Sequence, residues 1–94
     1  MFGFGKKPRT REIENFAFAA IEETVGERGH SDGKIFDSAF EELITRLEDY
    51  AVRHNLGRWG RSVLCGTVDQ FLSHYMRPDV RAGLIEKVRR KILI

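Results

Sequence analysis

Hydrophobic residues recur every three to four positions over most of this chain, which is the spacing of the buried face of an α-helix. Four segments follow this pattern, at about residues 10–25, 34–54, 60–75 and 79–93. The second can instead begin about four residues later, where Asp37 or Ser38 can cap it. No segment shows the sustained alternation of apolar and polar residues that marks a half-buried β-strand. We therefore expect an all-α fold, either a small four-helix bundle or a compact helical array, with the regular bundle favoured.

Glycines and a capping residue set the expected limits of these helices. Thr10 can cap the first helix, and Gly26 is a natural end for it. Residues 26–33 contain three glycines and predict a loop. Gly57 suits the left-handed position after the second helix, and Gly66, inside the third, is expected to let another helix approach closely.

The length of 94 residues predicts one domain. We expect a single helical domain at residues 10–94, preceded by a flexible basic arm at residues 1–9. The chain has one cysteine, so no disulfide can form within it, which is typical of a reducing compartment. No stretch has the composition of a signal peptide or of a membrane span, so the expected location is the cytoplasm.

Charge is sorted along the chain, although the net charge is only +2. Residues 12–57 carry eleven acids and four bases, whereas residues 58–94 carry eight bases and three acids. The first two helices should therefore be acidic and the last two basic. Such surfaces can pair within one chain or between the chains of an antiparallel homodimer.

Candidate catalytic and metal-binding residues lack the required spacing. Cys65 and His74 are nine residues apart on one predicted helix, about half a turn out of phase, so they should point to opposite sides. Cys65 is better interpreted as a small core residue. The other histidines, His30 and His54, form no zinc-ligand pair with a cysteine or histidine. We expect a protein that is not an enzyme and that uses no cofactor or metal.

The most suggestive local pattern is the turn at residues 57–62, in which Arg58 and Arg61 flank Trp59 between two glycines. Backbone N–H groups at a helix start, together with arginines, can hold a phosphate or a carboxylate. The favoured interpretation is structural: Trp59 packs over the end of the core, and the arginines lie in water.

Apolar residues outside the helical stripes point to a partner. Phe18 lies off the apolar face of the first helix, and Leu93 extends an apolar end beyond the last charges. Our leading hypothesis is an adaptor or regulatory protein that acts by protein–protein interaction and can self-associate. The residues expected to contact the partner protein are Phe18, Arg58, Trp59, Arg61 and Leu93.

The alternative is a nucleic-acid-binding protein that uses the basic arm, the turn and the last helix. The residues that this alternative requires are Lys6, Lys7, Arg9, Arg11, Arg58, Arg61, Arg89, Arg90 and Lys91. The acidic middle of the chain opposes it, because carboxylates repel phosphates. Membrane contact by Phe2 and Phe4 is a weaker reading still, since stable anchoring usually takes two signals.

Overall fold

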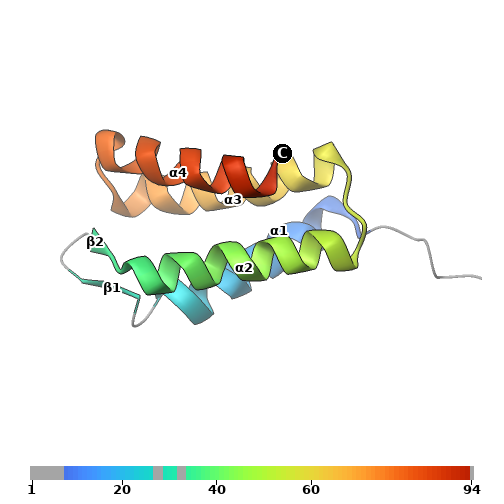
Figure 1. The fold of residues 1–94 in the computed structure, drawn as a ribbon, viewed down its shortest axis with the longest axis horizontal. Helices are drawn as coiled ribbons and strands as arrows, with labels where there is room; N and C mark the ends of the chain where they lie inside the picture. Colours follow the sequence, from blue (N-terminus) through green and yellow to red (C-terminus); the bar gives the residue numbers. More distant parts are fainter. Residues whose placement is uncertain (1–7, 27–28, 32–33, 94) are drawn as a thin grey trace, which may run out of the picture.

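The computed structural model describes residues 8–26, 29–31 and 34–93 (Figure 1). The four α-helices are α1 (Thr10–Ile21), α2 (Asp37–Arg53), α3 (Arg58–Tyr75) and α4 (Pro78–Ile92). A π-helical turn, η1 (Glu22–Gly26), continues α1, and a short antiparallel hairpin of β1 (His30–Ser31) and β2 (Lys34–Ile35) leads to α2. The prediction of an all-α fold with four helices is confirmed.

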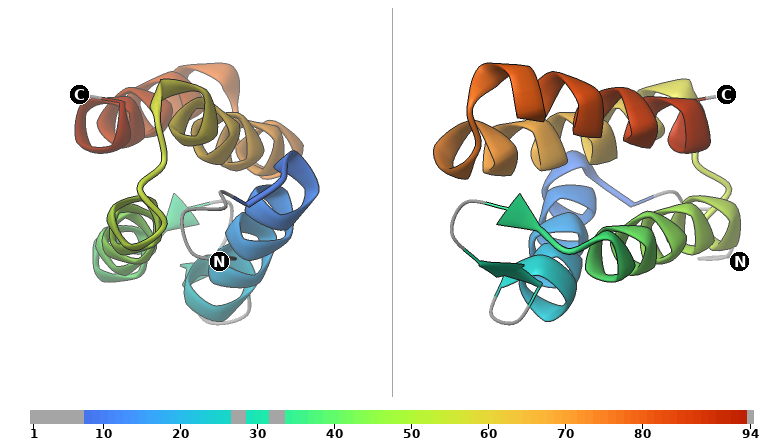
Figure 2. Two further views of the ribbon diagram at one scale, coloured as in Figure 1. Left: turned by 90° about the vertical axis from the view of Figure 1, so that its right-hand side faces the viewer. Right: turned by 60° about the vertical axis from the view of Figure 1, so that its left-hand side comes forward.

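The helices form two layers. The antiparallel pair α3 and α4 lies over α1 and α2 (Figures 1 and 2). α1 packs mainly against α3, while α2 packs against α4 and η1. Because α1 runs obliquely across the other helices (Figure 2), the structure is a compact helical array and not the regular bundle that we favoured. Of the helices that the structure describes, none combines the length and the apolar character needed to cross a bilayer.

The core lies between the two layers and receives side chains from all four helices. Each large apolar side chain that leaves water stabilises the fold by about 1.5–3 kcal/mol, so packing between the layers outweighs any single surface interaction. The largest fully buried side chains are Phe40, Ile13, Ile21, Leu43, Leu47, Leu64, Leu72, Ile92, Val25, Val68 and Val88.

Two expected helical segments are not α-helical. Residues 22–26 form η1, where Thr24 Oγ1 donates a hydrogen bond to the Ala20 carbonyl oxygen at 2.7 Å and so competes for a helix carbonyl. Residues 34–35 form β2 because the backbone of Ile35 pairs with that of His30, which also buries the Ile35 side chain. A strand of two residues is too short to show an alternating pattern in the sequence.

The expected helix caps are also corrected. Asn55, and not Gly57, takes the left-handed conformation after α2, with φ of 51°, which asparagine tolerates better than most residues. Gly57 instead precedes α3, and its carbonyl accepts a hydrogen bond from the Arg61 N–H. At α1 the N-cap is Arg9, not Thr10, and Glu12 Oε1 accepts a hydrogen bond from the Arg9 backbone N–H at 2.8 Å.

Candidate functional site

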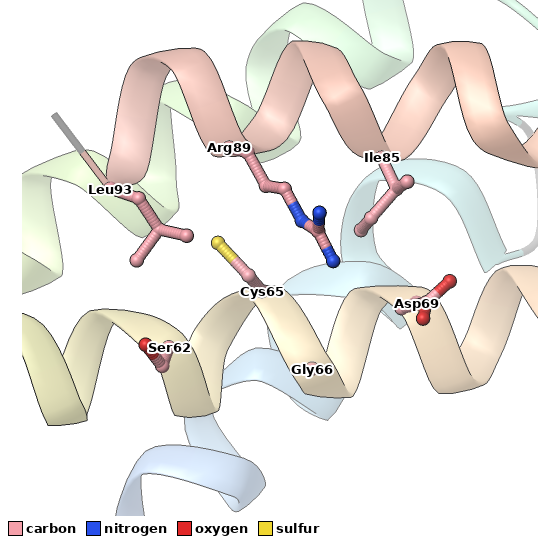
Figure 3. Close-up of a pocket in the computed structure, with 7 residues that line it drawn as sticks. All are labelled: Ser62, Cys65, Gly66, Asp69, Ile85, Arg89 and Leu93. Atoms are coloured by element: carbon pink, nitrogen blue, oxygen red, sulfur yellow. The ribbon is translucent and has the colours of Figure 1, made fainter.

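A groove of about 220 Å³ opens between α3 and α4, on the side away from α1 and α2 (Figure 3). Its lining residues are Ser62, Cys65, Gly66 and Asp69 from α3, and Ile85, Arg89 and Leu93 from α4. We call this site the α3–α4 groove. Pockets for small molecules are usually about 300–1,000 Å³. The α3–α4 groove is smaller, so it suits one or two inserted side chains better than a cofactor.

The helical repeat explains why these residues meet. Ser62, Gly66 and Asp69 are spaced at i, i+4 and i+7 on α3, and the three residues from α4 are spaced at i, i+4 and i+8. A Cβ atom built on Gly66 would meet nothing within 4 Å. The expectation that Gly66 allows close helix approach is therefore wrong, because Gly66 faces solvent and keeps the groove open.

The thiol of Cys65 forms part of the apolar floor. Cys65 is only 5% exposed, and burial raises the pKa of its thiol to about 11, while the nearby Arg89 charge acts in the opposite direction. The thiol is therefore protonated at neutral pH and is a poor nucleophile. His74 is exposed on α3, whereas Cys65 is buried, as the half-turn offset between them predicts.

Two side chains of opposite charge, Arg89 and Asp69, line the groove. The Arg89 side chain extends from α4 over the floor, between Cys65 and Asp69 (Figure 3). Asp69 Oδ1 lies 3.3 Å from Nε of Arg81, so this carboxylate already has a partner within the fold. Among the residues that the structure describes, no carboxylate forms an ion pair with Arg89. Arg89 is therefore the charge that remains available to an incoming group.

Arg61 has a structural role. Its Nη1 donates a hydrogen bond to the Ile92 carbonyl oxygen at 2.8 Å, and its Nε donates to the Leu56 carbonyl oxygen at 3.3 Å. Arg61 thereby joins the α2–α3 turn to the last turn of α4, where helix carbonyls lack intrahelical partners. The expectation that Arg61 lies in water is wrong, and an anion site at this turn would lack one of its two guanidinium groups.

The prediction that Trp59 packs over the end of the core is wrong. It is 62% exposed in the first turn of α3, beside the exposed Arg58. Trp59 precedes Gly66 by seven residues, which places both on the same face of α3. An exposed tryptophan beside an open groove is typical of a contact surface.

The remaining residues expected at a partner surface are split between the two layers. Leu93 is half-buried, lines the α3–α4 groove and follows Ile92, whose carbonyl oxygen accepts the hydrogen bond from Arg61. Phe18 is 42% exposed on α1, in the opposite layer. The structure thus brings four of the five predicted residues to the α3–α4 layer and leaves Phe18 apart.

The described basic residues of the alternative hypothesis lie on elements that meet near one end of the molecule, where α1 and α3 begin and α4 ends (Figure 1). Arg9, Arg11, Arg58, Arg89, Arg90 and Lys91 are exposed there. Nε of Arg90 lies 3.3 Å from a carboxylate oxygen of Glu86, and Arg61 is engaged with backbone carbonyls. Lys6 and Lys7 lie outside the described residues, as do Phe2, Phe4 and most of the predicted arm.

A second cavity, of about 200 Å³, lies beside α1 and α2, but the residues that line it already contact one another. The rings of Phe16 and Tyr50 stack with centroids 3.9 Å apart, and the centroid of the His54 ring lies 4.3 Å from that of Tyr50. Arg53 pairs with Asp49 at 2.9 Å. Burial, and then the charge of Glu12, raise the pKa of Tyr50, so its hydroxyl stays protonated at neutral pH.

Sequence reasoning missed Gly66, Ser62, Asp69 and Ile85 as site residues. Ile85, Arg89 and Leu93 do form a recognisable i, i+4, i+8 stripe, but the pairing of α4 with α3 was needed to show that this stripe lines a groove. The chain matches no family model, no curated protein and no solved structure.

Proposed function

We propose that this chain is a small cytoplasmic protein-binding module, without catalytic activity, that docks a partner on the α3–α4 groove. The partner inserts an apolar side chain that is flanked by carboxylates. The observation that carries this proposal is the groove itself, whose apolar floor of Cys65, Ile85 and Leu93 lies beside Arg89 and is kept open by Gly66.

The apolar floor supports an anchor side chain from a protein. Side chains that dominate protein interfaces fill desolvated pockets, and the surrounding contacts mainly exclude water. A helix that docks in a groove presents such anchors at i, i+3, i+4 and i+7. The groove runs between two antiparallel helices, and the exposed Trp59 on the same face of α3 can cover one flank of an incoming segment.

The charge of the α3–α4 layer supports an acidic partner. Residues 58–94 carry eight bases and three acids, and Arg89 stands at the groove itself. Complementary charge raises the rate of association and fixes orientation more than it strengthens binding. We therefore expect acidic flanks to select the partner and the apolar anchor to supply most of the affinity.

Nucleic acid is the second candidate ligand, because exposed basic side chains lie near one end of the molecule. A phosphate backbone would contact Arg58 and Lys91 but would leave the apolar floor unused. It would also approach Asp69, which carries the same sign of charge. The groove therefore favours a protein segment over a nucleic acid.

Selection from a displayed library of random helical peptides tests the proposal. The native protein is the bait, and selected peptides are measured on two variants, Gly66→Leu and Gly83→Leu. A Cβ at either glycine meets nothing within 4 Å, and both lie in exposed helix interiors, so both leucines should be accepted by the fold. Only the leucine at position 66 enters the groove.

We expect enrichment of peptides with an aromatic or aliphatic anchor flanked by Asp or Glu, with binding at least tenfold weaker to Gly66→Leu and unchanged for Gly83→Leu. Random duplex and single strands are measured in parallel at low salt. Equal peptide binding by both variants, or no enrichment, would contradict the proposal. Oligonucleotide binding that survives Gly66→Leu, together with failed peptide selection, would favour the nucleic-acid alternative.

A further inference from the structure

Phe18 on α1 has the features that the α3–α4 groove requires of its occupant. It is 42% exposed, and Glu14 and Glu22, one turn before and one turn after it, are both exposed. Residues at i−4, i and i+4 lie on one face of a helix. This chain therefore displays an aromatic side chain flanked by two carboxylates, which we call the Phe18 face.

We infer that the α3–α4 groove of one copy receives the Phe18 face of a second copy, an inference that rests on the proposed function. Phe18 of the second copy would lie on the floor formed by Cys65, Ile85 and Leu93. The carboxylates of Glu14 and Glu22 would face Arg89 and the neighbouring basic side chains of α4. The contact would place the Phe18 ring on the apolar floor of the groove and would pair the two carboxylates with basic side chains.

The charge of the two layers supports this pairing across the whole contact. The segment of residues 12–57, which contains the Phe18 face, has eleven acids and four bases, whereas residues 58–94 have eight bases and three acids. Within one copy, Lys87 Nζ lies 3.3 Å from Glu41 Oε2, so the two layers already attract each other at their junction. The outer surfaces of the layers can attract each other only between copies.

The same charges argue against a symmetric dimer through the groove. A two-fold dimer whose axis passes through the groove would set one basic α3–α4 layer against another. The Phe18 face and the groove lie on different layers, so their contact is head-to-tail. A head-to-tail contact leaves a free groove at one end and a free Phe18 face at the other, and assembly continues beyond two copies unless a ring closes.

Sedimentation velocity of the full chain at low salt, from about 10 µM to about 1 mM, tests this inference over the range of weak to moderate affinity. We expect the native chain and Gly83→Leu to form a concentration-dependent series of species that shifts towards monomer at high salt. Phe18→Ala and Gly66→Leu should each remain monomeric. Val52→Ala, at another exposed apolar residue, should assemble like the native chain.

An equimolar mixture gives the sharpest outcome. Phe18→Ala retains the groove and Gly66→Leu retains the Phe18 face, so the two variants share one intact contact and should form a dimer that grows no further. The double variant Glu14→Lys and Glu22→Lys keeps Phe18 but should also lose assembly. Circular dichroism of each variant confirms that it is folded.

A native chain that is monomeric throughout, or assembly that persists in Phe18→Ala, would overturn the inference. Dimers that form in each single variant alone would also overturn it, because they would show a different contact. If selected acidic peptides bind the native chain while the chain itself stays monomeric, the groove docks another protein. The proposed function then stands without self-assembly.

Discussion

Gly29 and Gly66 lie in two regions of the molecule that differ in how closely they are packed. A Cβ on Gly29 would clash with the Thr24 carbonyl oxygen and would lie 2.7 Å from Cβ of Ala39, whereas a Cβ on Gly66 would meet nothing within 4 Å. The first region is packed to its limit, and the second has unfilled space on its surface. The close packing around Gly29 stabilises the fold, whereas the apolar-lined space beside Gly66 is available to a ligand.

Hydrogen bonds reinforce the close packing around Gly29. The Phe36 N–H donates a hydrogen bond to the Gly29 carbonyl oxygen at 2.7 Å, and His30 Nδ1 lies 2.6 Å from the Val25 carbonyl oxygen, which can only accept a hydrogen bond. The hairpin is thus fixed against η1 by both shape and polar contacts. This region positions α2 and so determines where the core receives Phe40.

The largest effect is expected from Gly29→Ala. The methyl group would meet backbone atoms of η1, which cannot move away as a flexible side chain could, so the free energy of unfolding should fall by about 3 kcal/mol. Gly26→Ala is the matched control, because its Cβ would make ordinary contacts at 3.5 Å. Urea denaturation of both variants makes the measurement, and equal stabilities would contradict the contrast between the regions.

Arg61→Met should have the next largest effect, since it removes the two hydrogen bonds that join the α2–α3 turn to α4. Hydrogen bonds from charged groups contribute more than neutral ones, so we expect a loss of about 2 kcal/mol in unfolding free energy. Arg58→Met, at the exposed neighbour, should change stability by less than about 0.5 kcal/mol. A loss at position 58 as large as that at position 61 would refute the role assigned to Arg61.

Gly66→Ala and Gly83→Ala should each stabilise the fold by about 1 kcal/mol, because alanine is the better helix former and both sites have room. Thermal unfolding of the two variants checks this expectation. Destabilisation by Gly66→Ala alone would show that the groove is already filled in the folded chain.

The sequence predicted those features that depend on local spacing. The four helices follow from the period of residues such as Ile13, Leu47 and Val88, and the charge of each layer follows from composition. η1 and the hairpin could not be predicted, because strands of two residues are too short to show an alternating pattern and the apolar spacing does not distinguish a π-helical turn from an α-helical one. Ile35, for example, is buried only once its strand pairs with His30.

The candidate site was predicted only in part, for a related reason. Phe18 and Leu93 stood out as apolar residues outside the helical stripes, and Trp59 stood out as part of the turn at residues 57–62. Gly66 was noticed for the wrong role, since the sequence does not say whether a helical glycine faces a neighbouring helix or solvent. Arg61 looked like a surface charge, because its acceptors are backbone carbonyls that leave no trace in the sequence.

The smallest effect concerns the Cys65 thiol. Burial raises its pKa from 9.0 to about 11, so the folded chain holds the proton more tightly than the unfolded chain, and stability should fall as pH rises from about 9 to about 11. At pH 10 we expect a loss of about 1 kcal/mol or less. Cys65→Ala removes this contribution, so the difference between the two pH profiles isolates it; parallel profiles would show that the thiol is not held in an apolar environment.

The rate of alkylation of Cys65 tests the central claim most directly, and it is followed at mildly alkaline pH because the thiol is protonated at neutral pH. The chain has a single cysteine, and it lines the α3–α4 groove, so one reaction reports on one site. With a peptide selected for an apolar anchor and acidic flanks, the rate should fall as the peptide saturates the native chain and should stay constant for Gly66→Leu. A rate that is unchanged at saturating peptide would place the bound segment elsewhere and contradict the account.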